Sequence, residues 1–152
     1  MNIDQIELKV KSLDKTDKKF IYELLRAYGL PKASISRLRS GNLNLSKNDN
    51  VIIWKKKLFY QVELDADLHL TIDELVRNPN TQKHNPRFII LTDYDTLLSV
   101  DTKTGDSLDV ELERLDRHYD FFLPWAGMEK SQLQNENPAD VKAAEKMAKL
   151  FD

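Results

Sequence analysis

Cysteine is absent from the 152 residues, and glycine occurs only four times, at Gly29, Gly41, Gly105 and Gly127. The missing thiols exclude disulfide bonds, cysteine-ligated zinc and thiol catalysis, and they agree with a reducing compartment. Four scattered glycines cannot assemble a G-x-G-x-x-G motif or a phosphate-binding loop. We therefore expect a cytoplasmic chain that binds no cofactor by itself.

Long apolar runs are also missing. No stretch approaches the roughly 20 apolar residues that a membrane-spanning helix needs. Asp4 and Glu7 lie where a signal peptide would carry positive charge. The sequence thus predicts no membrane partner and no export, and 41% apolar residues suit one compact domain with a sizeable core.

Side chains for catalysis are sparse. The three histidines, His69, His84 and His118, have no short metal-ligand spacing, and carboxylates alone would have to complete a metal site. No serine lies in a G-x-S-x-G elbow. We expect neither catalytic nor metal-binding residues in this chain.

Two consecutive helices are predicted near the N-terminus. Apolar residues at positions 20, 21, 24, 25 and 28 recur at helical spacing, and Gly29 followed by Pro31 is a stop signal. A second, basic helix is expected from Pro31 to Gly41, with Ile35 and Leu38 buried.

Basic residues are concentrated in the first part of the chain. Residues 1–60 carry 13 Lys+Arg against 6 Asp+Glu, whereas residues 61–152 carry 10 against 19. Such a concentration favours binding to the phosphates of DNA, although basic residues often only solvate a surface. The predicted DNA-binding residues are Lys32, Arg37, Arg39, Lys47, Lys55, Lys56 and Lys57.

Strand patterns begin after residue 50. Residues 51–63 alternate as one extended run, interrupted at Lys56, where we expect a bend or bulge. Residues 71–78 are predicted as a helix, residues 87–93 as a buried strand, and residues 97–101 and 107–112 as a hairpin around Gly105. The predicted fold is α/β (α+β), with a central mixed sheet of about four strands, a C-terminal β-hairpin and flanking helices.

The last third of the chain contains an aromatic cluster and then a change of composition. Leu115, Tyr119 and residues 121–125 are expected to pack in a core rather than to hold a ligand. Residues 131–137 form a polar linker, and a helix is predicted from Asn137 without a stop signal at its end. We expect a domain over residues 1–130 and, over residues 131–152, the start of a connector in a longer protein.

Metal-dependent nucleases place one acid on a strand and another acid two residues before a lysine on the next strand. In residues 51–63 the second acid position is filled by Ile53 or Trp54, and neither Asp49 nor Glu63 has the required spacing. Three lysines without that carboxylate attract phosphate and repel metal ions. The pattern predicts a chain that does not cleave DNA.

Four segments carry a family resemblance: Phe20 to Gly41, Lys83 to Asp106, His118 to Gly127 and Pro138 to Phe151. In this order they resemble the N-terminal region of single-chain bacterial DNA adenine methyltransferases of the type IIG restriction-modification kind. That family continues into a helical connector, an S-adenosylmethionine-dependent N6-adenine methyltransferase domain and a target-recognition domain, and many members begin with a nuclease.

The resemblance implies a degenerate nuclease-like domain, with DNA and the methyltransferase domain of the same chain as partners. The Gly-rich methyl-donor motif and the Asn-Pro-Pro-Tyr motif of the family are absent here. S-adenosylmethionine would be the cofactor of the parent protein only, and this chain alone would not methylate. The alternative is a helix-turn-helix DNA-binding regulator that uses residues 20–41, with Pro31 to Ser40 as recognition helix.

Overall fold

The computed structural model of the chain describes residues 3–13, 19–48 and 50–128. Five strands form one open sheet in the order β1-β2-β3-β4-β5, of which β2 and β3 are parallel and the other neighbours antiparallel. The predicted mixed sheet with flanking helices is confirmed, with one strand more than expected. The strands are β1 (Val51–Trp54), β2 (Leu58–Val62), β3 (Phe88–Thr92), β4 (Thr96–Asp101) and β5 (Ser107–Glu111).

The additional strand comes from residues 51–63, which form a hairpin rather than one extended run. Trp54 pairs with Leu58, so residues 55–57 are a three-residue loop, and Lys56 adopts a positive φ of 67°. Because Ile52 pairs with Tyr60, the apolar residues of both strands stay on one face of the sheet. The alternating pattern therefore continues through the loop and conceals it.

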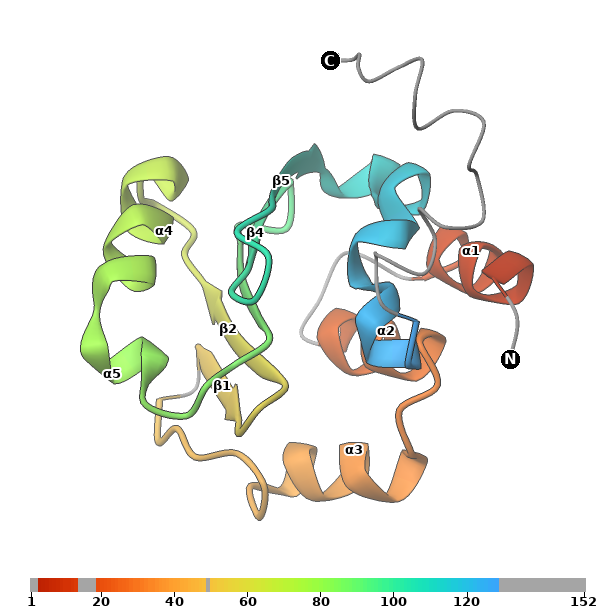
Figure 1. Cartoon of the computed structure of the whole chain (residues 1–152), viewed down its shortest axis with the longest axis horizontal. Helices are drawn as coiled ribbons and strands as arrows, with labels where there is room; N and C mark the ends of the chain where they lie inside the picture. The colour runs from red at the N-terminus through yellow and green to blue at the C-terminus, as the bar shows by residue number, and fades with distance from the viewer. Residues whose placement is uncertain (1–2, 14–18, 49, 129–152) are drawn as a thin grey trace.

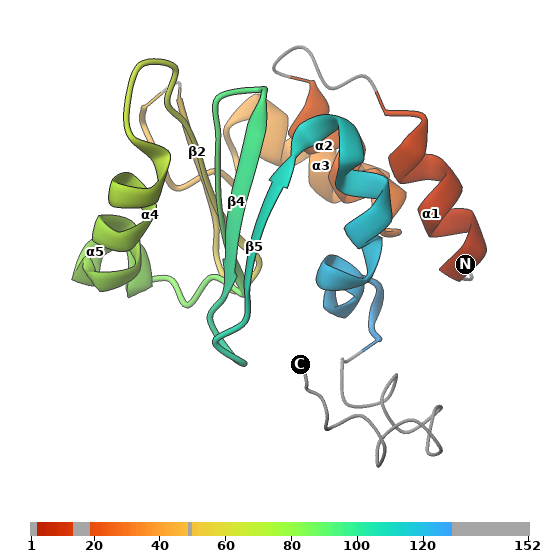
Figure 2. The same ribbon diagram turned by 90° about the horizontal axis from the view of Figure 1, so that it is seen from above.

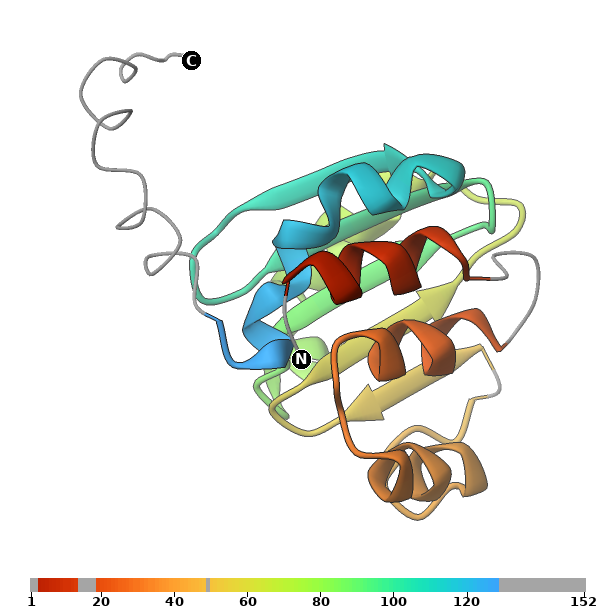
Figure 3. The same ribbon diagram turned by 90° about the vertical axis from the view of Figure 1, so that its right-hand side faces the viewer.

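Helices cover both faces of the sheet (Figure 2). On one face lie α4 (Leu68–Arg77) and α5 (Pro79–Gln82). On the other face lie α1 (Ile3–Lys11), α2 (Phe20–Ala27) and η1 (Leu112–Ala126), a stretch of 3-10 helix with a kink at His118. The helix α3 (Lys32–Ser40) lies near the β1 edge of the sheet (Figures 1 and 3).

Side-chain caps set the limits of α4. The Asp67 carboxylate accepts hydrogen bonds from the backbone N–H groups of His69 and Leu70, so the helix begins at Leu68 and not at the predicted residue 71. Its predicted end at the Asn78-Pro79 pair is confirmed, and Asn78 in turn caps α5.

The main core lies between the sheet and the layer of α1, α2 and η1. Phe88 of the buried strand β3 contacts three rings of η1, those of Phe121, Phe122 and Trp125, with centroid distances of 5.6, 4.9 and 5.1 Å. These are ordinary edge-to-face and tilted packing distances. The aromatic residues are core, as predicted, and a smaller core joins α4 to Leu91 and Leu98 on the opposite face.

The predicted domain boundary near residue 130 and the predicted helix from Asn137 lie outside the described residues. Both stay predictions. Within the described ranges, no helix combines the length and the apolar character needed to cross a membrane.

Candidate nucleic-acid interface

The helix α3 carries three of the predicted DNA-binding residues. It follows Pro31, whose extended backbone precedes the first turn, and it ends at Gly41, whose φ of 100° turns the chain away. Ile35 and Leu38 are buried, and they fix one stripe of the helix to the core. The remaining positions include Lys32, Arg37 and Arg39, all exposed, and no residue of α3 is acidic.

The cations of α3 do not share one face. Consecutive helical residues are turned by about 100°, which places Arg37 and Arg39 roughly 160° apart around the axis. Lys32 and Arg39 line a cavity between α1, α2 and α3, whereas Arg37 is not part of its lining. Two of the three predicted cations are therefore brought together, and Arg37 belongs to a separate surface.

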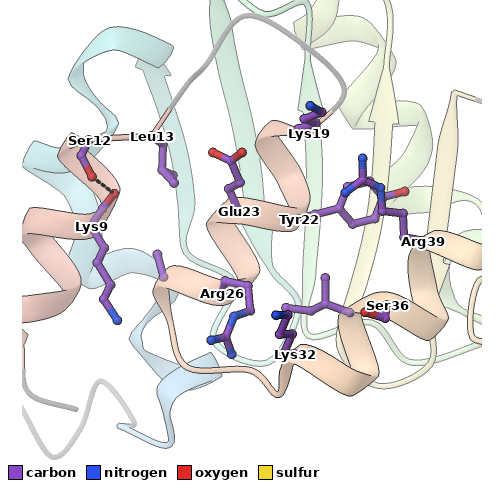
Figure 4. Close-up of a pocket in the computed structure, with 12 residues that line it drawn as sticks. Lys9, Ser12, Leu13, Lys19, Tyr22, Glu23, Arg26, Lys32, Ser36 and Arg39 are labelled. Carbon is purple, nitrogen blue, oxygen red and sulfur yellow. Dashed lines mark hydrogen bonds between the residues drawn. The ribbon is translucent and has the colours of Figure 1, made fainter.

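This cavity has a volume of about 470 Å³ and opens on the outer side of the helical layer (Figure 4). We name it the basic cavity, because five of its lining side chains are cationic and one is anionic. Its lining residues are Lys9, Ser12, Leu13, Lys19, Tyr22, Glu23, Arg26, Ala27, Lys32, Ile35, Ser36 and Arg39.

Three of its cations, Lys9, Lys19 and Arg26, were not predicted from the sequence. Lys19, the N-cap of α2, and Arg26 could have been found from the helical periodicity of the sequence. Positions 19, 22, 23 and 26 form the polar stripe opposite the buried residues of this helix. Lys9 comes from α1, a helix that was not predicted either, and only tertiary packing brings it here.

Few contacts neutralise the basic cavity. Within the described residues, none of Lys9, Arg26, Lys32 and Arg39 forms an ion pair with a carboxylate. Arg26 Nη1 donates a hydrogen bond of 2.9 Å to the Leu30 carbonyl oxygen, which fixes the guanidinium at the end of α2. In the part of the chain that the structure describes, the positive charge of these four side chains is thus available to an anion.

Arg39 and Tyr22 form a cation–π pair on one wall of the basic cavity. The Arg39 guanidinium lies 5.4 Å from the centroid of the Tyr22 ring, a cation–π distance. Burial raises the pKa of the Tyr22 phenol, and the nearby Arg39 charge partly opposes that shift. The phenol therefore stays neutral and acts as an aromatic surface with a hydroxyl at its edge.

The lysine loop, residues 55–57, forms a second basic feature at the end of the first hairpin. Lys55 and Lys56 are exposed, and Lys57 is half-buried. The loop backbone is held from two sides, since Lys56 N–H donates to His84 O at 2.9 Å and Trp125 Nε1–H donates to Lys57 O at 3.1 Å. These bonds hold the backbone of the lysine loop in place.

Lys47 lies on the segment that covers the free edge of β1. Leu45 N–H donates to Ile53 O, and the Asn44 side-chain oxygen accepts from Ile53 N–H, both at 2.9 Å. These bonds satisfy the outer edge of β1 and leave Lys47 exposed. Neither Lys47 nor the lysine loop lines the basic cavity, so the seven predicted residues occupy several surfaces.

The lysines at positions 55–57 do not have the strand setting of a nuclease lysine. They lie in a turn, and Glu63 N–H continues the sheet by donating to Thr92 O. Asp49 is outside the described residues. Among the residues that are described, no three His, Asp or Glu side chains form a group suited to a metal ion. The expected absence of cleavage and the nuclease-like ancestry stay predictions.

Comparison with known proteins gives one family and one relative. The family model described as MmeI, N-terminal domain, matches residues 1–152. A protein of Bacillus subtilis (strain 168), named DNA methyltransferase A, is 40% identical over 149 residues, which cover 98% of this chain. The chain spans 17% of the length of that relative. No solved structure matches the chain.

Proposed function

The chain belongs to the family of the MmeI N-terminal domain, and on this premise we propose that it is the N-terminal domain of a longer DNA adenine methyltransferase of a restriction-modification system, of the type IIG kind. The likeness to a protein named DNA methyltransferase A supports this proposal. A protein that acts on the bacterial chromosome belongs in the cytoplasm. The role of the present domain is to contact the DNA backbone or to dock onto the methyltransferase domain of the same chain.

The methyl donor, S-adenosylmethionine, does not fit this part of the protein. Its binding motif needs closely spaced glycines, whereas each glycine here occupies a separate turn or helix end with φ between 82° and 100°. The Asn-Pro-Pro-Tyr motif is also absent from the 152 residues. Donor binding and methyl transfer are therefore assigned to the part of the parent protein that follows this domain.

The observation that supports DNA contact is the charge of α3. The helix is anchored by Ile35 and Leu38, and its exposed positions carry three cations and no acid. Cations that neutralise phosphates release condensed counterions, which gives an affinity without sequence preference that falls with salt. The exposed lysines of the hairpin loop add charge of the same sign.

A salt titration with duplex DNA tests this role. We expect the chain to bind duplexes of unrelated sequence with similar affinity, and Arg37→Ala to weaken all of them alike. Because this variant cannot neutralise the phosphate next to position 37, the slope of log affinity against log salt should fall by roughly one unit. Arg114→Ala is the matched control, because it removes an exposed arginine from η1, and it should leave both affinity and slope unchanged.

The same titration separates the alternatives. A helix-turn-helix regulator that reads bases with residues 20–41 would prefer one site, and Arg37→Ala together with Arg39→Ala would erase that preference. Binding of the wild-type chain that is undetectable even at low salt would overturn the DNA-contact role and leave docking onto the methyltransferase domain.

A further inference from the structure

The basic cavity has the size and chemistry of a site for a small organic anion. Its volume of about 470 Å³ falls within the usual range for ligand pockets, about 300 to 1,000 Å³. We propose that it binds a nucleoside phosphate, with the phosphate held by Arg26 and Lys32 and the base placed against Tyr22. The ligand is either a free mononucleotide or an unpaired nucleotide of DNA, and the second source rests on the proposed function.

Cations converge on one end of the basic cavity. In Figure 4 the side chains of Lys9, Arg26 and Lys32 extend toward the same end. One N–H of Arg26 is used by the Leu30 carbonyl, which orients the guanidinium and leaves further donors of its planar fork for phosphate oxygens. Cations around a concave surface also focus positive potential inside it. A phosphate fits this end.

The opposite end of the basic cavity is less favourable to an anion. The Glu23 carboxylate extends toward that end, on the side of Lys19 (Figure 4). A phosphate placed there would meet a negative charge, so the difference between the two ends gives the ligand one orientation.

An aromatic wall provides the surface for a base. Tyr22 is half-buried, and the Arg39 guanidinium lies over its ring, 5.4 Å from the centroid, which restrains the ring. Apolar side chains of Leu13, Ala27 and Ile35 also line the basic cavity. Unpaired bases are commonly bound by stacking on aromatic rings and arginine planes beside a cationic groove that holds the backbone.

This arrangement suits an unpaired nucleotide better than a duplex. The bases of a duplex are stacked inside the helix, where they cannot reach a recessed aromatic ring. Contact with duplex phosphates requires only exposed cations such as Arg37. A ligand site in the basic cavity therefore predicts that the protein prefers single-stranded to duplex DNA. Phosphate contacts on the outer surface of α3 predict no such preference.

The test compares four probes by calorimetry with the 152-residue chain: deoxyadenosine monophosphate, inorganic phosphate, a single-stranded oligonucleotide and the duplex of the same sequence. We expect the mononucleotide to bind at least about tenfold more tightly than inorganic phosphate, and the single strand more tightly than the duplex. Competition between mononucleotide and single strand would show that DNA is a source of the ligand, and its absence would limit the source to free nucleotide.

Two variants separate the two parts of the site. Tyr22→Leu keeps apolar volume but removes the ring, so it should lower mononucleotide affinity to the level of inorganic phosphate. Lys32→Gln changes an exposed residue and should weaken both ligands several-fold. Arg114→Gln is the control for a removed positive charge and should change neither affinity. Thermal unfolding of each variant shows that the fold is retained.

Each outcome decides between the two proposals. Equal affinity for mononucleotide and inorganic phosphate, or mononucleotide binding unchanged in both Tyr22→Leu and Lys32→Gln, would overturn the nucleotide site. If Arg37→Ala still weakened duplex binding in that case, the proposed function would stand. Conversely, mononucleotide binding without any duplex binding at low salt would support the nucleotide site and overturn the proposed contact with the duplex backbone, and the competition with the single strand would still decide the source of the ligand.

Discussion

The Asp101 carboxylate is fully buried at the end of β4, where the Arg87 guanidinium neutralises it. Two hydrogen bonds, of 2.9 and 3.1 Å, join the two side chains, and Asp101 Oδ1 also accepts from the backbone N–H groups of Lys103 and Thr104. This one carboxylate therefore ties the residue before β3 to the turn between β4 and β5.

Replacement of Arg87 tests how strongly the fold depends on that pair. Arg87→Met would leave a buried charge without its counterion, so we expect the free energy of unfolding to fall by about 3 to 5 kcal/mol. Asp73→Asn is the matched control, because it breaks the exposed Asp73–Arg77 pair and should cost less than about 1 kcal/mol. Denaturant titrations measure both, and equal effects of the two substitutions would contradict a special role for the buried pair.

A pH-dependent contact joins α4 to the edge strand β5. His69 Nε2 lies 2.7 Å from Asp109 Oδ2, and the hydrogen bond to this carboxylate, with its charge, raises the pKa of His69. A raised pKa in the folded state means that the contact stabilises the protein fully below the unfolded pKa of about 6.5 and that this effect disappears as pH rises through the folded value.

We therefore expect wild type to exceed His69→Gln in melting temperature near about pH 5.5, and the difference to shrink toward about pH 8.5. Because both side chains are exposed, the difference should be small and should decrease with added salt. A difference that grew with pH would show that neutral His69 makes the favourable contact.

At the scale of elements, the end of α3 depends on one backbone conformation. Gly41 has a φ of 100°, and a Cβ added there would meet nothing within 4 Å. The effect of Gly41→Ala should therefore come from the backbone alone, with stability reduced by about 1 to 2 kcal/mol. Gly41→Asn should have a smaller effect, because asparagine tolerates the left-handed region better. Thermal unfolding measures the loss of stability in the two variants, and equal losses would point to a steric cause.

Elements with one strong local signal could be predicted from the sequence. Helix α2 presents a complete apolar stripe, α3 is bounded by proline and glycine, and the hairpin of β4 and β5 has a glycine in its loop. In contrast, α1 buries only Ile6 and Val10 among its described residues and exposes Leu8, so its periodicity is weak. The first hairpin was not predicted because lysines fill its loop and no glycine marks it.

The candidate site likewise could be predicted from the sequence only in part. Lys32 and Arg39 could be predicted because a short basic helix is visible in the sequence. The cavity that brings them together is formed by three helices, and the packing of α2 against α1 and α3 decides which side chains meet there. The distribution of charge along the sequence indicates which part of the chain is basic. It does not show that Arg37 and Arg39 lie on different sides of α3, which follows from the helical geometry.

At the scale of the whole molecule, the first and last described elements pack against each other, since α1 contacts η1 (Figure 3). About 100 residues separate them, which the ribosome adds in about 5 to 20 seconds at about 5 to 20 residues per second. During that interval the first helix has been synthesised but lacks the surface that covers Ile6 and Val10. We therefore expect the domain to complete its fold late, with the α1 wall of the basic cavity fixed only when η1 has emerged.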